Sequence, residues 1–436
     1  MKAGFAREPI TPKLGTAMQG YALRDAKRGV EAIHDGLFAR ALYLEQAGSA
    51  LLIVGLDLLA LDRPTVDLYN AAIRDAIGLD ADRVLLNTSH THNGPCSCGW
   101  YYAEPDPVYL DRVEAAIVKA ATAARDGARE ATAWAGETHS ELPLNRRKKD
   151  AQDRLIFAPN PDGPVCDTLP LCLIKDVDDE PVALLFSVSC PPSTVSGFAV
   201  SADFAGVAME RLDRHLGAPV SLFLQGAGGD AKPSVLGQGG EWHTGDWNDV
   251  RRAGLMVARE AMGSLAMGLF RVHPRFRVGL IDMPWPLIPP PGEGEYRALL
   301  EHPASQGDDP ESVCRHRWAE HQLARLDADG TLRSGLDIRL HGVQLGNRVR
   351  LVGLEGDAVS ELGLLVRDAY REGVTFALGC TNGCRMVLPT SAMLYEGGTE
   401  VLSYFEYRQP SPLAKGMEHI FTEGIEELRR SGVGEL

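Results

Sequence analysis

Two histidines, His90 and His92, stand two residues apart in the stretch SHTHNGPCSC at residues 89–98. The apolar run before them, RVLLNT at 83–88, predicts a buried strand, and side chains two apart on an extended strand point to the same face. Functional groups collect where a rigid strand ends in a loop, because the scaffold holds them in place. We therefore predict that both imidazoles line a working pocket, as metal ligands or as an acid and a base.

A basic run in an otherwise acidic chain, LPLNRRKKD at 142–150, contains Arg146 and Arg147. Such a run can be a solvated loop without any function. Alternatively, guanidinium groups that follow a strand-like LPLN offer paired donors suited to a carboxylate, a phosphate or an oxyanion. On this second interpretation we assign Arg146 to catalysis and Arg147 to substrate binding.

A third stretch, LFLQGAGGDAKPS at 222–234, is a predicted strand that breaks into a glycine cluster. Glycines let the backbone turn sharply and direct N–H groups at an anion, so we assign Gly228 and Gly229 to substrate binding. Asp230 and Lys232 place charge at the same tip and are our candidates for catalysis. A tight turn without function is the alternative. The glycine spacing differs from that of a phosphate-binding P-loop.

Acidic side chains follow a further apolar run in VRLVGLEGDAVSELG at 349–363, namely Glu355, Asp357 and Glu361. An acid immediately past a strand end can ligate a metal or act as a base. Capping of the next helix by Ser360 and Glu361 explains the same pattern equally well. From the residues alone, both interpretations stay open.

The elements that must position these groups alternate along the chain. Amphipathic stretches at 108–127 and 201–217 predict helices. Short runs of Val, Leu and Ile predict buried strands at 50–61, 83–88, 182–189, 221–225 and 349–354. This alternation predicts an α/β fold, which we assign to one domain spanning 1–436. The Pro-rich stretch at 285–311 is predicted to be a surface or lid insertion, because proline does not fit a central strand.

The composition limits the function classes. A chain of 436 residues with 44% hydrophobic content can bury a large core. Its 59 acidic and 44 basic side chains give a net charge of −15, so we expect neither nucleic acid nor a membrane as partner. No export signal is apparent, which predicts a cytoplasmic protein, and such enzymes often form homo-oligomers. The scattered cysteines are then expected to be reduced, with Cys96 and Cys98 packing the turn behind the histidines.

Taken in order, these segments resemble the catalytic domain of the neutral/alkaline non-lysosomal ceramidase family, in particular its shorter bacterial members. The resemblance runs nearly end to end through EPITPKLGTAMQGYA, IHDGLFARALYLE, SHTHNGP, PLNRRK, NPDGPV, the SADF helix, FLQGAGGDAKP, LEGDAVSELG and VLPTSAMLYEGG. It implies layered mixed β-sheets flanked by helices and zinc-dependent hydrolysis of an amide. By the same resemblance, Tyr395 is assigned to substrate binding.

The family's zinc is held by two histidines, a glutamate and a tyrosine, and these positions carry over unevenly. The first histidine falls on His90, while His92 matches the histidine that faces the reacting centre. The glutamate position holds Asp357, which keeps the carboxylate. The second histidine position holds Pro191 and the tyrosine position holds Val387, neither of which is a ligand. The resemblance therefore implies a degenerate zinc site.

Two outcomes for this site stay open. A metal, with zinc as the expected one, can be rebuilt on His90 and Asp357 with His92 or a cysteine, for which Cys190, Cys384 and Cys98 are the candidates. Alternatively, the pocket works without a metal, with a histidine as general base and Lys232, Arg146 and the glycine turn stabilising an oxyanion.

The cations near the predicted pocket favour a small anionic substrate over ceramide itself. We therefore predict a ceramidase-like amidase, a hydrolase of a small amide, lactam or lactone, with C–N bond cleavage favoured. One alternative is a catalytically inactive homologue that binds a ligand. Another is a metal-independent lyase or isomerase that uses the pocket histidines as acid and base.

Overall fold

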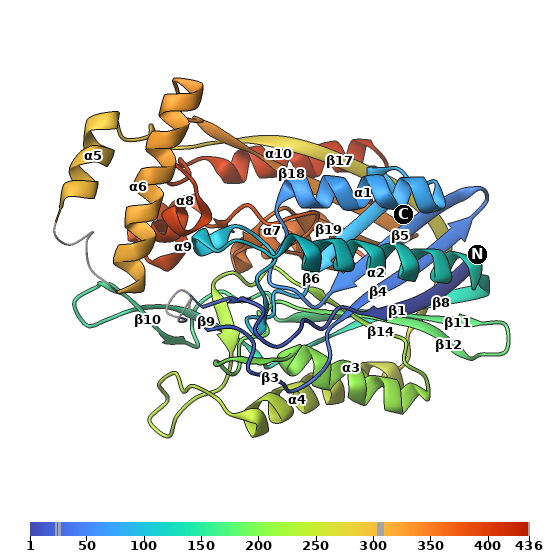
Figure 1. Ribbon diagram of the computed structural model, residues 1–436. Helices are drawn as coiled ribbons and strands as arrows, with labels where there is room; N and C mark the ends of the chain where they lie inside the picture. Colours follow the sequence, from blue (N-terminus) through green and yellow to red (C-terminus); the bar gives the residue numbers. More distant parts are fainter. Residues whose placement is uncertain (22–23, 25–27, 303–308, 435–436) are drawn as a thin grey trace.

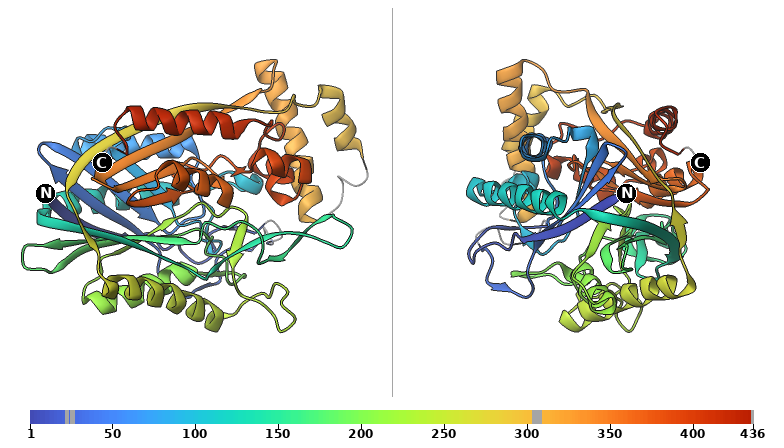
Figure 2. Two further views of the ribbon diagram at one scale, coloured as in Figure 1. Left: turned by 180° about the vertical axis from the view of Figure 1, so that it is seen from behind. Right: turned by 90° about the vertical axis from the view of Figure 1, so that its right-hand side faces the viewer.

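The computed structural model describes residues 1–21, 24, 28–302 and 309–434 of the chain. Two β-sheets stack face to face, and helices cover their outer faces (Figures 1 and 2). The core between the sheets contains Leu42 and Leu222 from one sheet and Leu351 and Phe376 from the other. The apolar runs of the sequence form these sheets because strands covered on both faces need apolar side chains on both.

The larger sheet has the strand order β14-β12-β11-β8-β1-β4-β5-β6, and β16 also pairs with β8. Most neighbours are antiparallel, but β5 with β6 and β12 with β14 are parallel. Its strands are β1 (Lys2–Pro9), β4 (Phe38–Gln46), β5 (Ser49–Leu56), β6 (Val84–Thr88), β8 (Arg129–His139), β11 (Thr168–Asp176), β12 (Pro181–Val188), β14 (Ser221–Gln225) and β16 (Phe270–Val272).

The smaller sheet has the order β17-β18-β19-β21, in which β19 and β21 are parallel. Its strands are β17 (Pro274–Pro286), β18 (Gly335–Gly346), β19 (Val349–Leu354) and β21 (Val374–Leu378). Pro284 and Pro286 lie in β17, which is an edge strand, where a missing backbone N–H leaves no ladder partner unsatisfied.

The helices form three groups around the sheets. α1 (Arg63–Ile77) and α2 (Pro107–Asp126) cover β1, β4 and β5, and α3 (Asp203–Leu216) and α4 (Trp247–Met267) cover the opposite end of the same sheet. α7 (Ser360–Ala369) and α10 (Met417–Arg430) cover the smaller sheet. None of the helices in the described part of the chain is long and apolar enough to cross a membrane.

A group of helices and 3-10 turns stands at one end of the molecule (Figure 1). It consists of α5 (Glu293–Glu301), α6 (Pro310–Asp329), α8 (Ser391–Glu396) and α9 (Thr399–Leu402), with the 3-10 turns η2 (Trp100–Tyr102) and η4 (Ser403–Tyr407). A small separate core of Tyr296, Cys314, Trp318 and Phe405 holds α5 and α6 against η4. The other short elements are η1 (Ala81–Arg83), β2 (Met18–Gln19), β3 (Ala32–Ile33), β7 (Gly94–Pro95), β9 (Pro143–Lys149), β10 (Leu155–Asn160), β13 (Ala199–Val200), β15 (Ala231–Pro233), β20 (Asp357–Ala358) and β22 (Val387–Leu388).

The α/β fold class predicted from the sequence is confirmed. The predicted helices at 108–127 and 201–217 are α2 and α3, and the predicted strands are β5, β6, β12, β14 and β19. The Pro-rich stretch at 285–311 begins inside β17, contains α5 and ends in the first turn of α6. Residues 303–308 of that stretch lie outside the described residues.

Candidate active site

The carboxyl ends of strands from both sheets meet at one place, and Asn87 in β6 ties them together. The Asn87 side chain accepts a hydrogen bond from the backbone N–H of Gln225 at 2.8 Å and donates to the carbonyl of Gly379 at 2.9 Å. Gln225 ends β14, and Gly379 follows β21. The polar segments that continue from these strands are therefore held side by side, as expected for the carboxyl ends of parallel strands.

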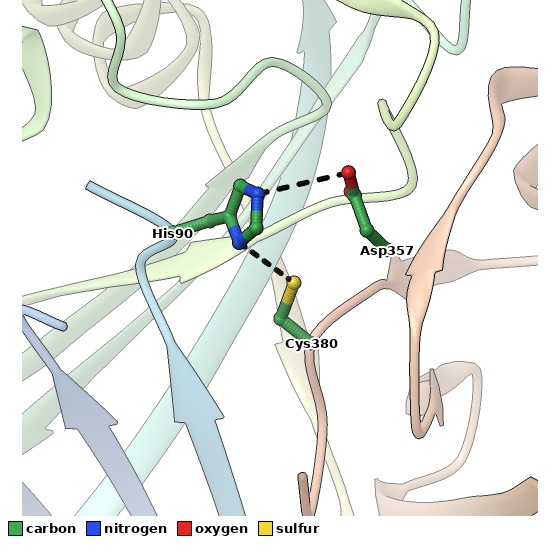
Figure 3. A group of neighbouring side chains, drawn as sticks. All are labelled: His90, Asp357 and Cys380. Atoms are coloured by element: carbon green, nitrogen blue, oxygen red, sulfur yellow. Dashed lines mark hydrogen bonds and ion pairs between the residues drawn. The ribbon is translucent and has the colours of Figure 1, made fainter. Parts of the chain in front are cut away.

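A buried cluster of His90, Asp357 and Cys380 lies at this meeting point (Figure 3). The His90 Nε2 atom is 3.6 Å from Asp357 Oδ2, and its Nδ1 atom is 3.3 Å from Cys380 Sγ. Nδ1 also lies 2.8 Å from the carbonyl oxygen of Leu59. Because a carbonyl only accepts, Nδ1 carries a proton, which leaves Nε2 directed at Asp357. One side chain each from the segments after β6, β19 and β21 thus forms the cluster.

The backbone is held in an unusual conformation at two members of this cluster. His90 has a φ of 61° and Cys380 a φ of 47°, in the left-handed region that residues with a Cβ rarely adopt. Backbone hydrogen bonds from His90 to Leu58, at 2.9 Å, and from Cys380 to Gly356, at 2.7 Å, hold both residues in place. Strain that the surrounding structure maintains in this way is concentrated at functional sites.

The cluster is electrostatically coupled. Burial lowers the pKa of His90, but the neighbouring Cys380 and Asp357 outweigh it and raise that pKa to about 9. Burial raises the pKa of the Cys380 thiol, whereas a hydrogen bond from Cys384 and the charge of His90 bring that pKa down to about 7. The two sulfurs are 3.8 Å apart. Near neutral pH, the pair therefore favours a thiolate beside an imidazolium.

His92 lies beside this cluster, with its ring centroid 5.2 Å from that of His90 and 5.0 Å from that of Tyr21. Both ring nitrogens of His92 are buried and have no hydrogen-bond partner among the described residues. Burial, followed by the charges of His90, Arg146, Arg24 and Lys232, lowers the pKa of His92 well below its usual value. A neutral imidazole with an unoccupied nitrogen is therefore available as a general base.

The three cluster residues suit a divalent metal in type and spacing. One ligand atom from each lies within 4.8 Å of the others, and the buried Asp357 Oδ1 atom has no hydrogen-bond partner in the described structure. The bond from Nδ1 to Leu59 is the kind that orients a metal-binding histidine. Three protein donors are also what a catalytic zinc site uses. The fit has one strained feature, because Asp357 and Cys380 face different nitrogens of the same ring.

Lys232, in β15, faces a pocket of about 520 Å³ that also exposes Tyr21, Arg24 and Arg28. The Lys232 ammonium lies 5.3 Å from the centre of the Trp242 ring and 5.6 Å from that of Phe157. Within the described part of the chain, it forms no hydrogen bond or ion pair. Burial and the charge of Arg146 lower its pKa.

Arg146 and Arg147, in β9, are anchored by acids. Both form ion pairs with Glu400, Arg146 at 2.8 Å and Arg147 at 2.5 Å, and Arg147 also pairs with Glu396 at 3.1 Å. They line a neighbouring cavity of about 330 Å³. Arg146 is near enough to His92 and Lys232 to lower the pKa of each. The basic run is therefore a partly buried strand rather than a solvated loop, because Glu400 compensates its charge.

Asp230 and Gly229 hold the site together in this structure. One carboxylate oxygen of Asp230 accepts from the backbone N–H and the hydroxyl of Ser360, both at 2.7 Å, and the other accepts from Asn145 at 3.0 Å. The Gly229 N–H donates to the carbonyl of Ala358 at 2.9 Å, so it is not free for an oxyanion. A Cβ on Gly229 would lie 2.5 Å from the backbone oxygen of Asp357, and one on Gly228 would lie 2.1 Å from that of Ser189. These two glycines therefore permit close packing.

Tyr395 is not brought to the cluster. Its side chain is 75% exposed on α8, and its hydroxyl accepts a hydrogen bond from Lys415 at 2.9 Å. The assignment of Tyr395 to substrate binding therefore stays a prediction.

The positions expected to have lost a ligand do lie next to the site. Val387 is paired with Asp357 in the short ladder of β20 with β22, and the carbonyl of Pro192, next to Pro191, accepts from the backbone N–H of His92 at 3.0 Å. The residue that joins the cluster instead, Cys380, was not among our candidate cysteines. Its signal was the Cys-x3-Cys spacing with Cys384 directly after an apolar run, at a strand end.

No protein-family model and no curated protein matches this chain. Among solved structures, a ceramidase complexed with C2 matches all of this chain and 76% of its own, with a TM-score of 0.72 at 17% identity. A neutral ceramidase from Pseudomonas aeruginosa matches 98% of this chain and 74% of its own, with a TM-score of 0.70 at 16% identity. The chain has a ceramidase-like fold. This confirms the resemblance inferred from the order of the motifs, and the ceramidase-like fold spans the whole chain.

Proposed function

We propose that this protein hydrolyses the C–N bond of a small anionic amide or lactam at the His90–Asp357–Cys380 cluster. The observation that carries the proposal is the juxtaposition of this buried cluster with a neutral, unpartnered His92. The ceramidase-like fold supports amide hydrolysis as the reaction class. A lactone, in which oxygen replaces the amide nitrogen, is the related ester substrate.

An anionic substrate is supported by the pocket next to His92. Arg24, Arg28 and Lys232 line it, and no carboxylate does so among the described residues. Lys232 has neither a hydrogen bond nor an ion pair within that part of the chain, so its charge is available to a ligand. A substrate carboxylate bound to Lys232 would lie beside His92. These two side chains are close enough that the charge of Lys232 lowers the pKa of His92.

Zinc is the cofactor that the donor set favours, with His90, Asp357 and Cys380 as the residues that would hold it. When bound, it would supply a Lewis acid for the substrate carbonyl. His92 would accept a proton from the attacking water and return it to the departing nitrogen. Lys232, with Arg24 and Arg28 in the same pocket, would hold the anionic end of the substrate.

A second candidate mechanism rests on the order of the cluster. Cys380, His90 and Asp357 form a thiol–imidazole–carboxylate series, with the thiol and the carboxylate on different ring nitrogens (Figure 3). In this mechanism the Cys380 thiolate attacks the carbonyl carbon, the C–N bond breaks, and the nitrogen takes a proton from the imidazolium. Water then hydrolyses the thioester, which returns the proton to His90 and frees the thiolate.

The two mechanisms predict different results for zinc content, for treatment with a chelator and for modification of Cys380. In the zinc mechanism, the purified protein contains about one zinc per chain, a chelator abolishes hydrolysis, and Cys380→Ser weakens metal affinity by roughly tenfold or more. In the thiol mechanism, a chelator has no effect, and iodoacetamide inactivates by modifying Cys380. Cys384→Ser is the matched control, because it also removes a buried thiol from the pair but leaves the atom that contacts His90.

The substrates for this experiment are short amides, lactams and lactones with and without a carboxylate. Faster turnover of the carboxylate-bearing member of each pair is the expected result. Turnover of long-chain ceramide ahead of the acidic amides would contradict the substrate class. If the folded wild-type protein hydrolysed no member of the series, the reaction class would be wrong, and a ligand-binding homologue or a lyase would replace it.

A further inference from the structure

A third polar cavity, of about 240 Å³, lies on another side of the cluster from the Lys232 pocket. Its walls come from the start of α1, the η2 turn, the inner side of α6 and the segments around Arg385 and Arg408. Trp100 and Cys384 line this cavity. They also contact the cluster, since the Trp100 ring is 6.0 Å from that of His90 and the Cys384 sulfur is 3.8 Å from that of Cys380. The two sites are thus adjacent and share a wall.

The lining of this cavity is strongly cationic. Asp62 is its one carboxylate among the described residues, and the arginines that line it are Arg63, Arg325, Arg333, Arg385 and Arg408. Asp62 accepts a hydrogen bond from the backbone N–H of Gly99 at 3.0 Å. Like charges gathered around a cavity repel one another, so this arrangement is unfavourable unless something negative occupies it.

Three of these arginines have acidic partners. Arg63 forms an ion pair with the fully buried Glu355. Arg408 pairs with Glu104 at 2.9 Å, and Arg325 lies 3.6 Å from Asp329, but both of these acids are exposed. Exposed ion pairs hold a charge weakly.

Within the described part of the chain, Arg333 and Arg385 form no ion pair, and their guanidinium groups donate no hydrogen bond. Burial raises the pKa of Asp62, and Arg385 is near enough to that acid to offset part of the rise. The Nε atom of Arg385 is fully buried and unsatisfied. Burial, followed by the charges of Arg385 and Arg325, lowers the pKa of Arg333 to about 10. Unsatisfied buried groups of this kind call for a ligand.

We propose that this arginine cavity is a binding site for a small oxyanion, a carboxylate or phosphate group, that is separate from the active site. Guanidinium groups bind both kinds of group through paired N–H donors. The cavity is smaller than the ~300 Å³ at which drug-sized ligand pockets begin, which limits the ligand to a small molecule. The Trp100 and Tyr407 rings, with centroids 4.5 Å apart, form the apolar part of its wall.

The test is titration calorimetry on the full-length protein at low ionic strength, with inorganic phosphate and citrate as separate probes. We expect wild-type protein to bind at least one of them and Arg333→Gln/Arg385→Gln to bind it about tenfold or more weakly. The matched control is Arg297→Gln/Arg371→Gln, which removes the same charge from two exposed arginines. This control should bind as wild type does.

Two further measurements keep the result decisive. Thermal unfolding of the Arg333→Gln/Arg385→Gln variant should show little loss of stability, because neither guanidinium forms an ion pair or a hydrogen bond within the described part of the chain. A Lys232→Met variant should bind the same probe as tightly as wild type does. The proposal is overturned if neither probe binds, if the arginine variant binds as wild type does, or if Lys232→Met abolishes the binding. None of these measurements depends on hydrolysis, so the proposed hydrolase activity can fail without affecting the result for the arginine cavity.

Discussion

At the scale of single residues, His92 combines two properties that seldom occur together. Both of its ring nitrogens are buried, and neither is hydrogen-bonded within the described part of the chain. A structural histidine normally uses at least one of them, because an unsatisfied buried polar group destabilises the fold. The unpartnered nitrogens therefore indicate that they interact with a bound ligand or take part in proton transfer.

We expect His92→Gln to lower kcat by about 10²–10⁴-fold, because the amide keeps the polarity of the ring but cannot take up a proton. The measurement is turnover of the best acidic amide as a function of pH. The wild-type kcat should show no step near pH 6 to 7 from this residue, since its pKa lies well below the usual histidine value. His419→Gln, at an exposed position on α10, is the control. Unchanged kcat in His92→Gln would exclude its role as the base.

At the scale of elements, the site depends on close approach between segments rather than on any one strand. The turn after β14 lies directly against the segment after β19, where Gly229 contacts Asp357. Asp230 then binds the first turn of α7 through Ser360 and the β9 strand through Asn145. The helix start and the strand are thus fixed relative to each other by one buried carboxylate.

Gly229→Ala tests this packing. A Cβ there would lie 3.0 Å from the carboxyl carbon of Asp357, so the acid must shift. We expect a loss of roughly 1–3 kcal/mol in unfolding free energy together with loss of activity. Gly263→Ala is the matched control, because it lies on the exposed side of α4 with open space around it. That variant should keep full activity and gain about 0.5–1 kcal/mol, since alanine favours helix. Full activity in Gly229→Ala would contradict the packing argument.

At the scale of the whole molecule, buried acids couple stability to pH. Asp203 is fully buried, and burial raises its pKa to about 6, above the ordinary value of 3.8 that it has in the unfolded chain. A raised folded-state pKa stabilises the fold at low pH, and that contribution is lost as the pH rises from about 4 through about 6. Many exposed acids titrate too, so the effect must be isolated by comparison.

The Asp203→Asn variant isolates the contribution of this carboxyl group to the pH dependence of stability. The difference in unfolding free energy, wild type minus variant, should fall by about 2 kcal/mol between pH 4 and pH 7, because only the wild type must ionise a buried acid. Denaturant unfolding at several pH values measures this difference. Asp178→Asn, at an exposed turn position, is the control and should show no such trend. A difference that stays constant with pH would show that Asp203 titrates normally.

Much of the fold could be predicted because short-range patterns in the sequence indicate the type of each element. Runs such as SLFLQ and VRLVGL are typical of buried strands, and the apolar stripe at 108–127 is typical of an amphipathic helix. The position of His90 and His92 at a strand end followed from the same reasoning. The proximity of Arg146, Lys232 and Asp357 to the histidines was predicted from the family resemblance, and their mutual effects on pKa support it.

The sequence by itself determined the element types, the α/β class and the segments that carry polar groups, because these depend on neighbours within a few residues. Only the tertiary structure decided which cysteine contacts His90 and that Asp230 links α7 to β9. It also decided that Arg333 and Arg385 line one cavity without an ion pair among the described residues. Each of these depends on segments far apart in the chain, whose approach is fixed by how two sheets and their helices pack. Spacing along a chain carries no information on that distance.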